Sequence, residues 1–187
     1  IAFTQGFNPR PKITFAQALS VGVTSSSEYM DVEFYEDVSV DDVAFKLNQV
    51  LPEGIKILDV KVADEKLALS MLNGATYIVT VVLGEVALEE LKKSLKSLLQ
   101  HEEIIIEKKT KSGKKLVNIA PLIYNLDLAD NCGDTAKIAM SLSMGQQGNV
   151  APMTVIQQLE SILEKNLQVV SIHRGEMFYK TGDKKIS

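Results

Sequence analysis

The feature that most constrains the fold is an ordered change of hydrophobic periodicity along residues 76–187. Apolar runs of strand length alternate with stretches in which leucine, isoleucine or valine recurs at helical spacing. The expected strands are 77–83, 136–142 and 169–172, and the expected helices are 88–99 and 152–163. With an extra hairpin arm between helix 88–99 and strand 136–142, this series is closest to the order strand, helix, strand, strand, helix, strand. That order predicts a ferredoxin-like antiparallel sheet with both helices on one face.

The hairpin inserted into this pattern is basic. Its two runs, 103–109 and 115–119, flank Lys111-Ser112-Gly113, which is typical of a hairpin tip. Five lysines lie within eight residues: Lys108, Lys109, Lys111, Lys114 and Lys115. A basic β-arm of this kind can lie along a phosphate backbone, and we consider RNA its ligand. The alternative is a solvated tip whose lysines deter edge-to-edge pairing.

Residues 1–75 show an incomplete version of the same pattern. We expect strands at 2–4, 29–35 and 55–62 and a helix at 40–51, with no opening strand and helix before them. The sequence therefore predicts an α+β fold of two ferredoxin-like halves, 1–75 and 76–187, the first lacking its opening strand and helix. A sheet shortened in this way exposes an edge and an apolar face, so a dimer is possible.

Composition narrows the class of protein. Hydrophobic residues make up 45% of the chain and charged residues 24%, as in ordinary globular domains. No apolar run approaches the ~20 residues of a membrane-spanning helix. Cys132 is the single cysteine, which rules out an internal disulfide and favours a reducing, cytoplasmic location. The net charge of −4 argues against a general nucleic-acid coat protein, so any basic surface must be local.

A stiff segment near the start, Asn8-Pro9-Arg10-Pro11-Lys12, is the second candidate binding site. Each proline fixes its own φ and pushes the preceding residue into an extended conformation. In an extended segment the side chains of Asn8, Arg10 and Lys12 point the same way, which suits a phosphate, a carboxylate or a partner backbone. The alternative is a structural crossover in which Arg10 pairs with Glu28 or Asp31.

Other residue types offer little chemistry. His101 has no possible metal ligand three or four residues away, and His173 has only Glu176. Cys132 has no second cysteine with which to hold an iron–sulfur cluster. We therefore expect no metal and no cofactor, and we find no catalytic constellation. Four aromatic residues could stack on bases in an RNA-binding sheet, although core packing is the default expectation. They are Phe7, Phe15, Tyr29 and Phe178.

One run of sequence resembles a known family. The run Gly6-Phe7-Asn8-Pro9-Arg10-Pro11-Lys12-Ile13-Thr14-Phe15-Ala16, followed by Gly22-Val23 and Glu28-Tyr29-Met30-Asp31-Val32, is similar to bacterial radical-SAM-linked domains of unknown function. Gly148-Asn149-Val150 and His173-Arg174 extend the resemblance, although Ala151 stands where an arginine is expected. The resemblance implies a radical-SAM protein as partner and makes Arg174 a further candidate. The family's usual opening, a basic strand and a helix with a His-Leu-Asp run, is not in this sequence.

These observations leave three functions open. The favoured one is a non-catalytic binding module that presents RNA or a protein to a radical-SAM partner. The second is an RNA-modifying or RNA-processing enzyme whose site is completed by an N-terminal segment outside this sequence. The third is a structural protein–protein adaptor. The candidate binding residues are Asn8, Arg10, Lys12, Lys108, Lys109, Lys111, Lys114, Lys115 and Arg174.

Overall fold

The computed structural model describes residues 1–64, 68–110, 113–145, 148–181 and 184–186. Its contacts divide the chain into two compact units. Unit 1 consists of Ile1–Ala16 and Tyr29–Met71, and unit 2 of Gln17–Glu28 and Leu72–Ser187. The segment 17–28, which the sequence placed in the N-terminal half, therefore belongs with the C-terminal unit. The chain is an α+β protein in which antiparallel pairing predominates.

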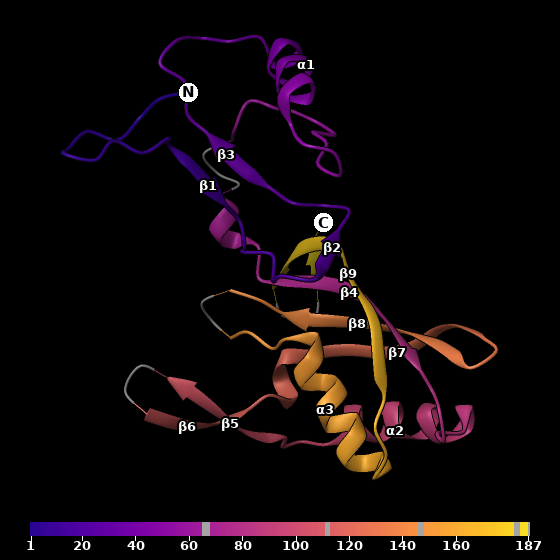
Figure 1. Ribbon diagram of the computed structural model, residues 1–187. Coiled ribbons are helices and arrows are strands. Elements are labelled where there is room, and N and C mark those ends of the chain that lie inside the picture. The colour runs from indigo at the N-terminus through magenta and orange to yellow at the C-terminus, as the bar shows by residue number, and fades with distance from the viewer. Residues whose placement is uncertain (65–67, 111–112, 146–147, 182–183, 187) are drawn as a thin grey trace. The chain divides into compact units, whose positions relative to one another are not determined.

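Unit 2 is built on a six-stranded sheet (Figure 1). The strands follow the order β10-β9-β4-β8-β7, and neighbours along this path are antiparallel. A further short strand, β2, adds to β9 in parallel, which is why the segment 17–28 joins this unit. The strands are β2 (Val23–Ser25), β4 (Gly74–Val82), β7 (Ile123–Cys132), β8 (Thr135–Ser143), β9 (Gln168–Thr181) and β10 (Lys184–Ile186).

Two helices cover one face of this sheet. They are α2 (Leu88–Gln100) and α3 (Pro152–Leu163), and Figure 1 shows both on the same side of the strands. Leucine spacing gives α2 an apolar face that includes the buried Leu91 and Leu95, whereas Pro152 starts α3 at a position that needs no backbone donor. The helices bury these faces against inward-pointing side chains of the strands, such as Val79 and Ile138.

The basic hairpin of unit 2 forms a separate two-stranded sheet. Its strands are β5 (Ile105–Thr110) and β6 (Gly113–Asn118), close to the ranges expected from sequence. A short 3₁₀ turn, η2 (Ala120–Leu122), leads from the hairpin into β7. Ile106 and Val117 pack against the main core, so the base of the hairpin is part of unit 2 and its tip extends from it.

Unit 1 is smaller than unit 2 and buries fewer hydrophobic side chains. It contains the antiparallel strands β1 (Ile13–Phe15) and β3 (Met30–Val32), helix α1 (Val40–Val50) and a 3₁₀ turn, η1 (Leu69–Met71). Within the described part of this unit, Ala2 is the only hydrophobic residue that is fully buried, and α1 buries none. Among all described residues, no helix is both long and apolar enough to cross a membrane.

Three expectations from sequence were wrong. Residues 2–4 form no strand but only an isolated bridge, between Phe3 and Pro11. Residues 55–62 form no strand, because the side chain of Asn48 holds the backbone of Ile57 through both its N–H (2.8 Å) and its C=O (3.0 Å). Conversely, Asp127 and Asp130 lie on strand β7, a range to which the sequence pattern assigned no strand. Asp130 is placed opposite Lys137 and forms an ion pair with it at 3.1 Å, so the acidic residue fits the exposed side of the ladder.

Candidate nucleic-acid interface

The register of the β5–β6 hairpin, hereafter the lysine hairpin (residues 105–118), concentrates positive charge. Lys108 lies directly opposite Lys115, and Lys109 lies directly opposite Lys114. Like charges at opposed positions destabilise a two-stranded ladder, so folding alone gives no reason for two such pairs in succession. With five lysines and one glutamate, the hairpin carries a formal charge of +4 in a chain whose net charge is −4.

Pleating divides these lysines between the two faces of the hairpin. Lys108 and Lys115 share the face of Ile106 and Val117, and Lys109 and Lys114 share the opposite face. The sequence-predicted cluster is therefore a charged edge accessible from both sides rather than a single flat patch. Lys111 lies outside the described residues.

The base of the hairpin is fixed by hydrogen bonds around one side chain. The Asn118 side-chain oxygen accepts from the backbone N–H of Ile104 (2.9 Å) and of Ala120 (3.0 Å). The backbone N–H of Ile119 donates to the carbonyl of Ile104 at 2.9 Å. These bonds hold the two ends of the hairpin together on the core, so its charged part projects from a rigid support.

Only part of this charge is neutralised inside the protein. Lys114 pairs with Glu107 at 2.7 Å, and Lys108 donates a hydrogen bond to the backbone carbonyl of Asn149. Among the described residues, the ammonium groups of Lys109 and Lys115 have no acidic partner. Asn149 lies just before α3, so the positive end of that helix dipole lies near Lys108. The first turn of α3 carries no acidic residue that would offset this positive potential.

The second predicted site, in unit 1, is one side of a small turn. Phe3 and Pro11 form an antiparallel bridge, and the N–H of Lys12 donates to the carbonyl of Ala2 at 2.8 Å. Asn8, Arg10 and Lys12 are all exposed, but Lys12 is paired with Glu33. Within unit 1, the guanidinium of Arg10 has no ion-pair partner among the described residues.

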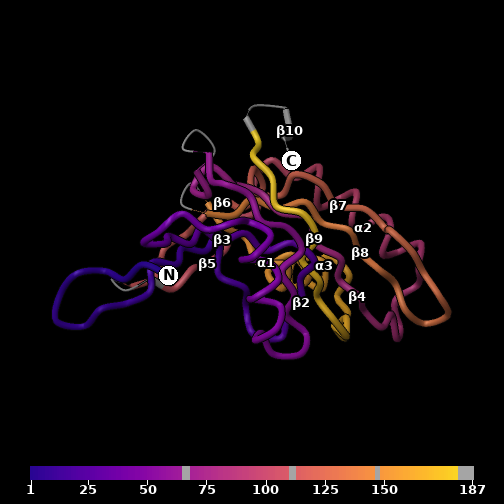
Figure 2. Tube along the Cα trace, turned by 90° about the horizontal axis from the view of Figure 1, so that it is seen from above, coloured from indigo at the N-terminus to yellow at the C-terminus, as the bar shows by residue number. Residues whose placement is uncertain are grey.

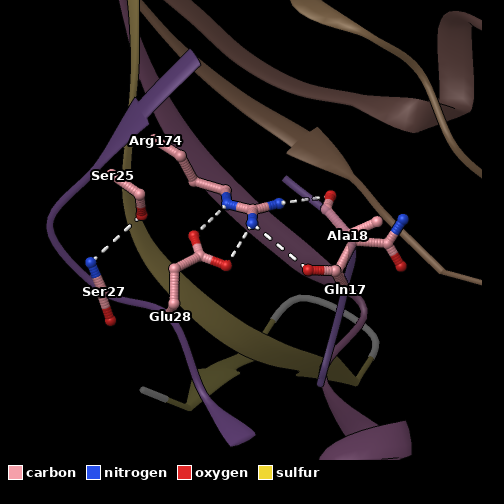
Figure 3. A network of polar contacts seen from close by, with 6 residues as sticks. All are labelled: Gln17, Ala18, Ser25, Ser27, Glu28 and Arg174. Carbon is pink, nitrogen blue, oxygen red and sulfur yellow. Dashed lines mark hydrogen bonds and ion pairs between the residues drawn. The ribbon is translucent and has the colours of Figure 1, made fainter. Parts of the chain in front are cut away.

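Arg174 is not available to a ligand. Its side chain is 3% exposed and makes a bidentate contact with Glu28, with Nε donating at 2.8 Å (Figure 3). The remaining donors reach the backbone carbonyls of Ala18 and Gln17, both at 3.4 Å. Arg174 therefore fastens the segment 17–28 to β9, which corrects its interpretation as a binding residue. Glu28, which the sequence offered as a partner for Arg10, is engaged here.

Sequence reasoning could not have found this pair, because Glu28 and Arg174 are 146 residues apart. The neighbouring His173 contacts the hydroxyl of Thr24 at 2.9 Å, so it also holds the same segment. Among the described residues, no group of three or more His, Cys, Asp or Glu side chains is placed to hold a metal ion.

The aromatic residues proposed for stacking behave differently from one another. Phe178 is buried beside Tyr124, with the two rings tilted by 53° and their centroids 6.2 Å apart. Phe178 is therefore a core residue. Phe7, in contrast, is fully exposed, although core packing was the default expectation for it. Phe15 and Tyr29 are also exposed in unit 1. An aromatic side chain accessible to a base is therefore present, but in the N-terminal turn rather than on the large sheet.

Comparison with known proteins adds family membership and a fold. Residues 1–152 match the profile of a family described as an uncharacterized protein conserved in bacteria, DUF2344. No curated protein sequence matches the chain. The fold is similar to a chain in the crystal structure of a Cbf5-Nop10-Gar1 complex, with a TM-score of 0.56 and 13% identity. That similarity covers 92% of this chain and 42% of the other, so this chain spans about two fifths of its length. Since the family profile covers most of the sequence, the chain belongs to the DUF2344 family.

Proposed function

We propose that this DUF2344 chain is an RNA-binding module and that the lysine hairpin is its main contact with the phosphate backbone. The observation that carries the proposal is the pair of opposed lysines, Lys108–Lys115 and Lys109–Lys114, in a ladder that they destabilise. An anionic polymer that follows the charged edge of the hairpin offsets this repulsion and releases counterions from the RNA.

The rest of unit 2 supports this assignment. The hairpin is anchored at its base, so ordering it on the ligand costs little conformational entropy. The N-terminus of α3 adds positive potential beside Lys108. The strand order β9-β4-β8-β7 with both helices on one face supports a ferredoxin-like interpretation of unit 2. In this proposal, the module presents RNA to a radical-SAM partner, the context that the sequence resemblance implies.

The test is a salt series with a matched charge control. The variant K109Q/K114Q/K115Q removes three charges from the hairpin but keeps Lys108, whose bond to Asn149 is structural. The control K92Q/K93Q/K96Q removes three charges from the helix α2 of the same unit. Binding of a labelled single-stranded RNA is followed by fluorescence anisotropy at increasing salt.

We expect the hairpin variant to bind RNA more weakly and to flatten the dependence of log K on log salt by roughly 0.7 per lost phosphate contact. The control should keep the slope of the unchanged protein. Equal slopes for the two triple variants would show that the hairpin is not the phosphate contact. Absence of RNA binding by the unchanged protein would exclude the function itself.

A second candidate function, protein docking, is favoured by a groove in unit 1. The groove has a volume of about 320 Å³ and lies between α1 and the two short strands. Its walls include the apolar side chains of Ile13, Val32 and Val43, and Asp37 and Asp42 are part of its lining. Lys46 is also part of the lining and pairs with Asp42 at 3.6 Å, which leaves Asp37 as the acidic group for a ligand. An apolar segment of a partner protein that carries one basic residue, such as a segment of the radical-SAM protein, fits this chemistry.

The docking function predicts a complex that depends on the groove. Val43→Asp places a charge in its wall, whereas Val62→Asp changes an exposed valine outside the lining. The purified radical-SAM partner should co-elute with the unchanged chain and with V62D, and not with V43D. Co-elution with V43D contradicts docking at the groove. If the chain elutes as a dimer that V43D dissociates, the groove binds a second copy instead.

A further inference from the structure

The turn of unit 1 that precedes β1 is a closed and stiff structure. The N–H of Thr4 donates to the carbonyl of Arg10 at 2.8 Å, and the N–H of Arg10 donates to the hydroxyl of Thr4 at 3.0 Å. These two bonds close residues 5–9 into a loop, hereafter the tip loop. Gly6 has a φ of +138°, which side-chain-bearing residues rarely adopt, and Pro9 fixes the other side. In Figure 2 this segment is the indigo loop close to the N-terminus.

The tip loop exposes an aromatic ring completely. Phe7 has a relative exposure of 104%, so its ring makes no packing contact that shields it. Burying a phenylalanine contributes about 1.5–3 kcal/mol, and a stiff loop cannot fold the ring back to gain it. A single exposed phenylalanine is common on protein surfaces. What distinguishes this one is its support on a closed loop and the polar groups beside it.

Those neighbouring groups are suited to a nucleotide. Asn8 follows Phe7 in the chain and Arg10 closes the loop, and both side chains are exposed. Within unit 1, the described residues supply no acidic partner for the Arg10 guanidinium. Residues 1–16 contain two basic residues and no Asp or Glu, and because Glu33 neutralises Lys12, Arg10 supplies the positive charge of this turn. An aromatic face next to a guanidinium is the combination by which proteins hold unpaired bases and their phosphates.

We propose that the tip loop binds an unpaired nucleotide, with the base stacked on Phe7 and the adjoining phosphate on Arg10. This inference rests on the proposed RNA function and adds to it a preference for single-stranded RNA. The lysine hairpin senses phosphate charge, which duplex and single strand both offer. Phe7 needs the face of a base, which a duplex hides in its stack.

The experiment compares three variants on two probes. Phe7→Ala removes the ring, Phe7→Tyr keeps an aromatic face, and Phe45→Ala removes another exposed phenylalanine of unit 1, on α1. The probes are a fluorescein-labelled oligouridine of about 12 nucleotides, within the range of single-strand sites, and a duplex RNA of equal length. Melting temperatures of all variants are measured in parallel, and we expect no change because both rings are exposed.

We expect Phe7→Ala to weaken binding of the oligouridine by roughly 5- to 150-fold, the effect of losing one stacked base, and to change duplex binding less than about 2-fold. Phe7→Tyr should bind like the unchanged protein, and so should Phe45→Ala. Arg10→Ala should lower the salt slope for the oligouridine by about 0.7, corresponding to one phosphate contact.

Several outcomes overturn the inference and separate it from the RNA function. If Phe7→Ala binds the oligouridine normally while K109Q/K114Q/K115Q does not, the hairpin function stands and the tip-loop site is wrong. Equal losses on both probes also contradict stacking. If the unchanged protein binds neither probe, both proposals fail. If Phe7→Ala keeps RNA affinity but loses the radical-SAM partner, the ring is a protein anchor rather than a base platform.

Discussion

The two units hold their secondary structure together by different means. In unit 2, helices and strands share a continuous core that extends from β4 through α2 and α3. In unit 1, by contrast, only Ala2 among the described hydrophobic residues is fully buried. The segments that flank the two short strands there are joined by backbone bonds, such as Ala2 N–H to Glu33 C=O at 2.7 Å, and by the Lys12–Glu33 ion pair. The comparison indicates that unit 2 supplies most of the buried core, whereas unit 1 leaves apolar side chains such as Phe45 and Val62 exposed.

The two units also differ in their balance of basic and acidic residues. Unit 1 has six basic and ten acidic residues, and unit 2 has fourteen of each. The basic residues of unit 2 are gathered, however, since five of them lie in the lysine hairpin. A neutral unit with one strongly basic projection suits a polyanion, and an acidic unit with exposed apolar groups suits a basic protein segment.

The largest expected effect tests the difference in packing. Leu159→Ala in α3 removes a fully buried side chain and should lower the free energy of unfolding by about 2–5 kcal/mol. Val50→Ala at the end of α1 removes an exposed side chain and should change it by no more than about 0.5 kcal/mol. Urea unfolding followed by circular dichroism measures both. Similar losses in the two variants would mean that unit 1 has a core comparable to that of unit 2.

The next effect concerns the pair that fastens segment 17–28 to unit 2. Glu28→Ala leaves the buried Arg174 cation without a counter-charge and should cost about 3 kcal/mol. Replacing both residues, as E28A/R174M, should recover part of this loss, since a methionine in place of the arginine needs no partner. A double-mutant cycle by urea unfolding measures the coupling. Additive losses would show that the two side chains do not depend on each other.

The sequence predicted the local parts of unit 2 well because these follow from side-chain periodicity. Helices 88–100 and 152–163, strand β8 and the lysine hairpin lie within a few residues of their expected ranges. Strand β7 was missed because Asp127 and Asp130 obscure its alternation, and these acids are tolerated where the strand is exposed. In unit 1, the expected strand 55–62 failed because a single asparagine, Asn48, replaces the ladder with local bonds.

The candidate site was predictable only where charge alone defines it. The lysines of the hairpin were identified from their spacing. The prolines around Arg10 made it a candidate, with pairing to Glu28 or Asp31 as the alternative. The burial of Arg174 was not, because it depends on a contact with Glu28 across most of the chain. Phe7 was weighed only as one of several aromatics, since sequence does not reveal whether a ring packs inward or stays in solvent.

The smallest expected effect uses acid to compare one ion pair from each unit. In unit 2, the hydrogen bond from Lys165 and that from the N–H of Ala87 lower the pKa of Glu90 below its ordinary value of 4.5. In unit 1, the hydrogen bond and charge of Lys61 lower the pKa of Asp59. The first pair joins residues 75 apart and forms only on folding, whereas the second joins near neighbours that remain together in the unfolded chain.

A carboxyl group whose pKa is lower in the folded state stabilises folding above its unfolded pKa, and this contribution is lost as the pH falls through the folded value. Lys165→Met should therefore reduce the free energy of unfolding at neutral pH, and the difference from the unchanged protein should shrink below pH 4.5. Lys61→Met should give a difference near zero at every pH, because its pair persists after unfolding. Both groups are exposed, so the Lys165 effect will be small, and urea unfolding at matched ionic strength is needed to resolve it. A pH-dependent loss in Lys61→Met would show that the fold of unit 1 holds its ion pair in place, as unit 2 does.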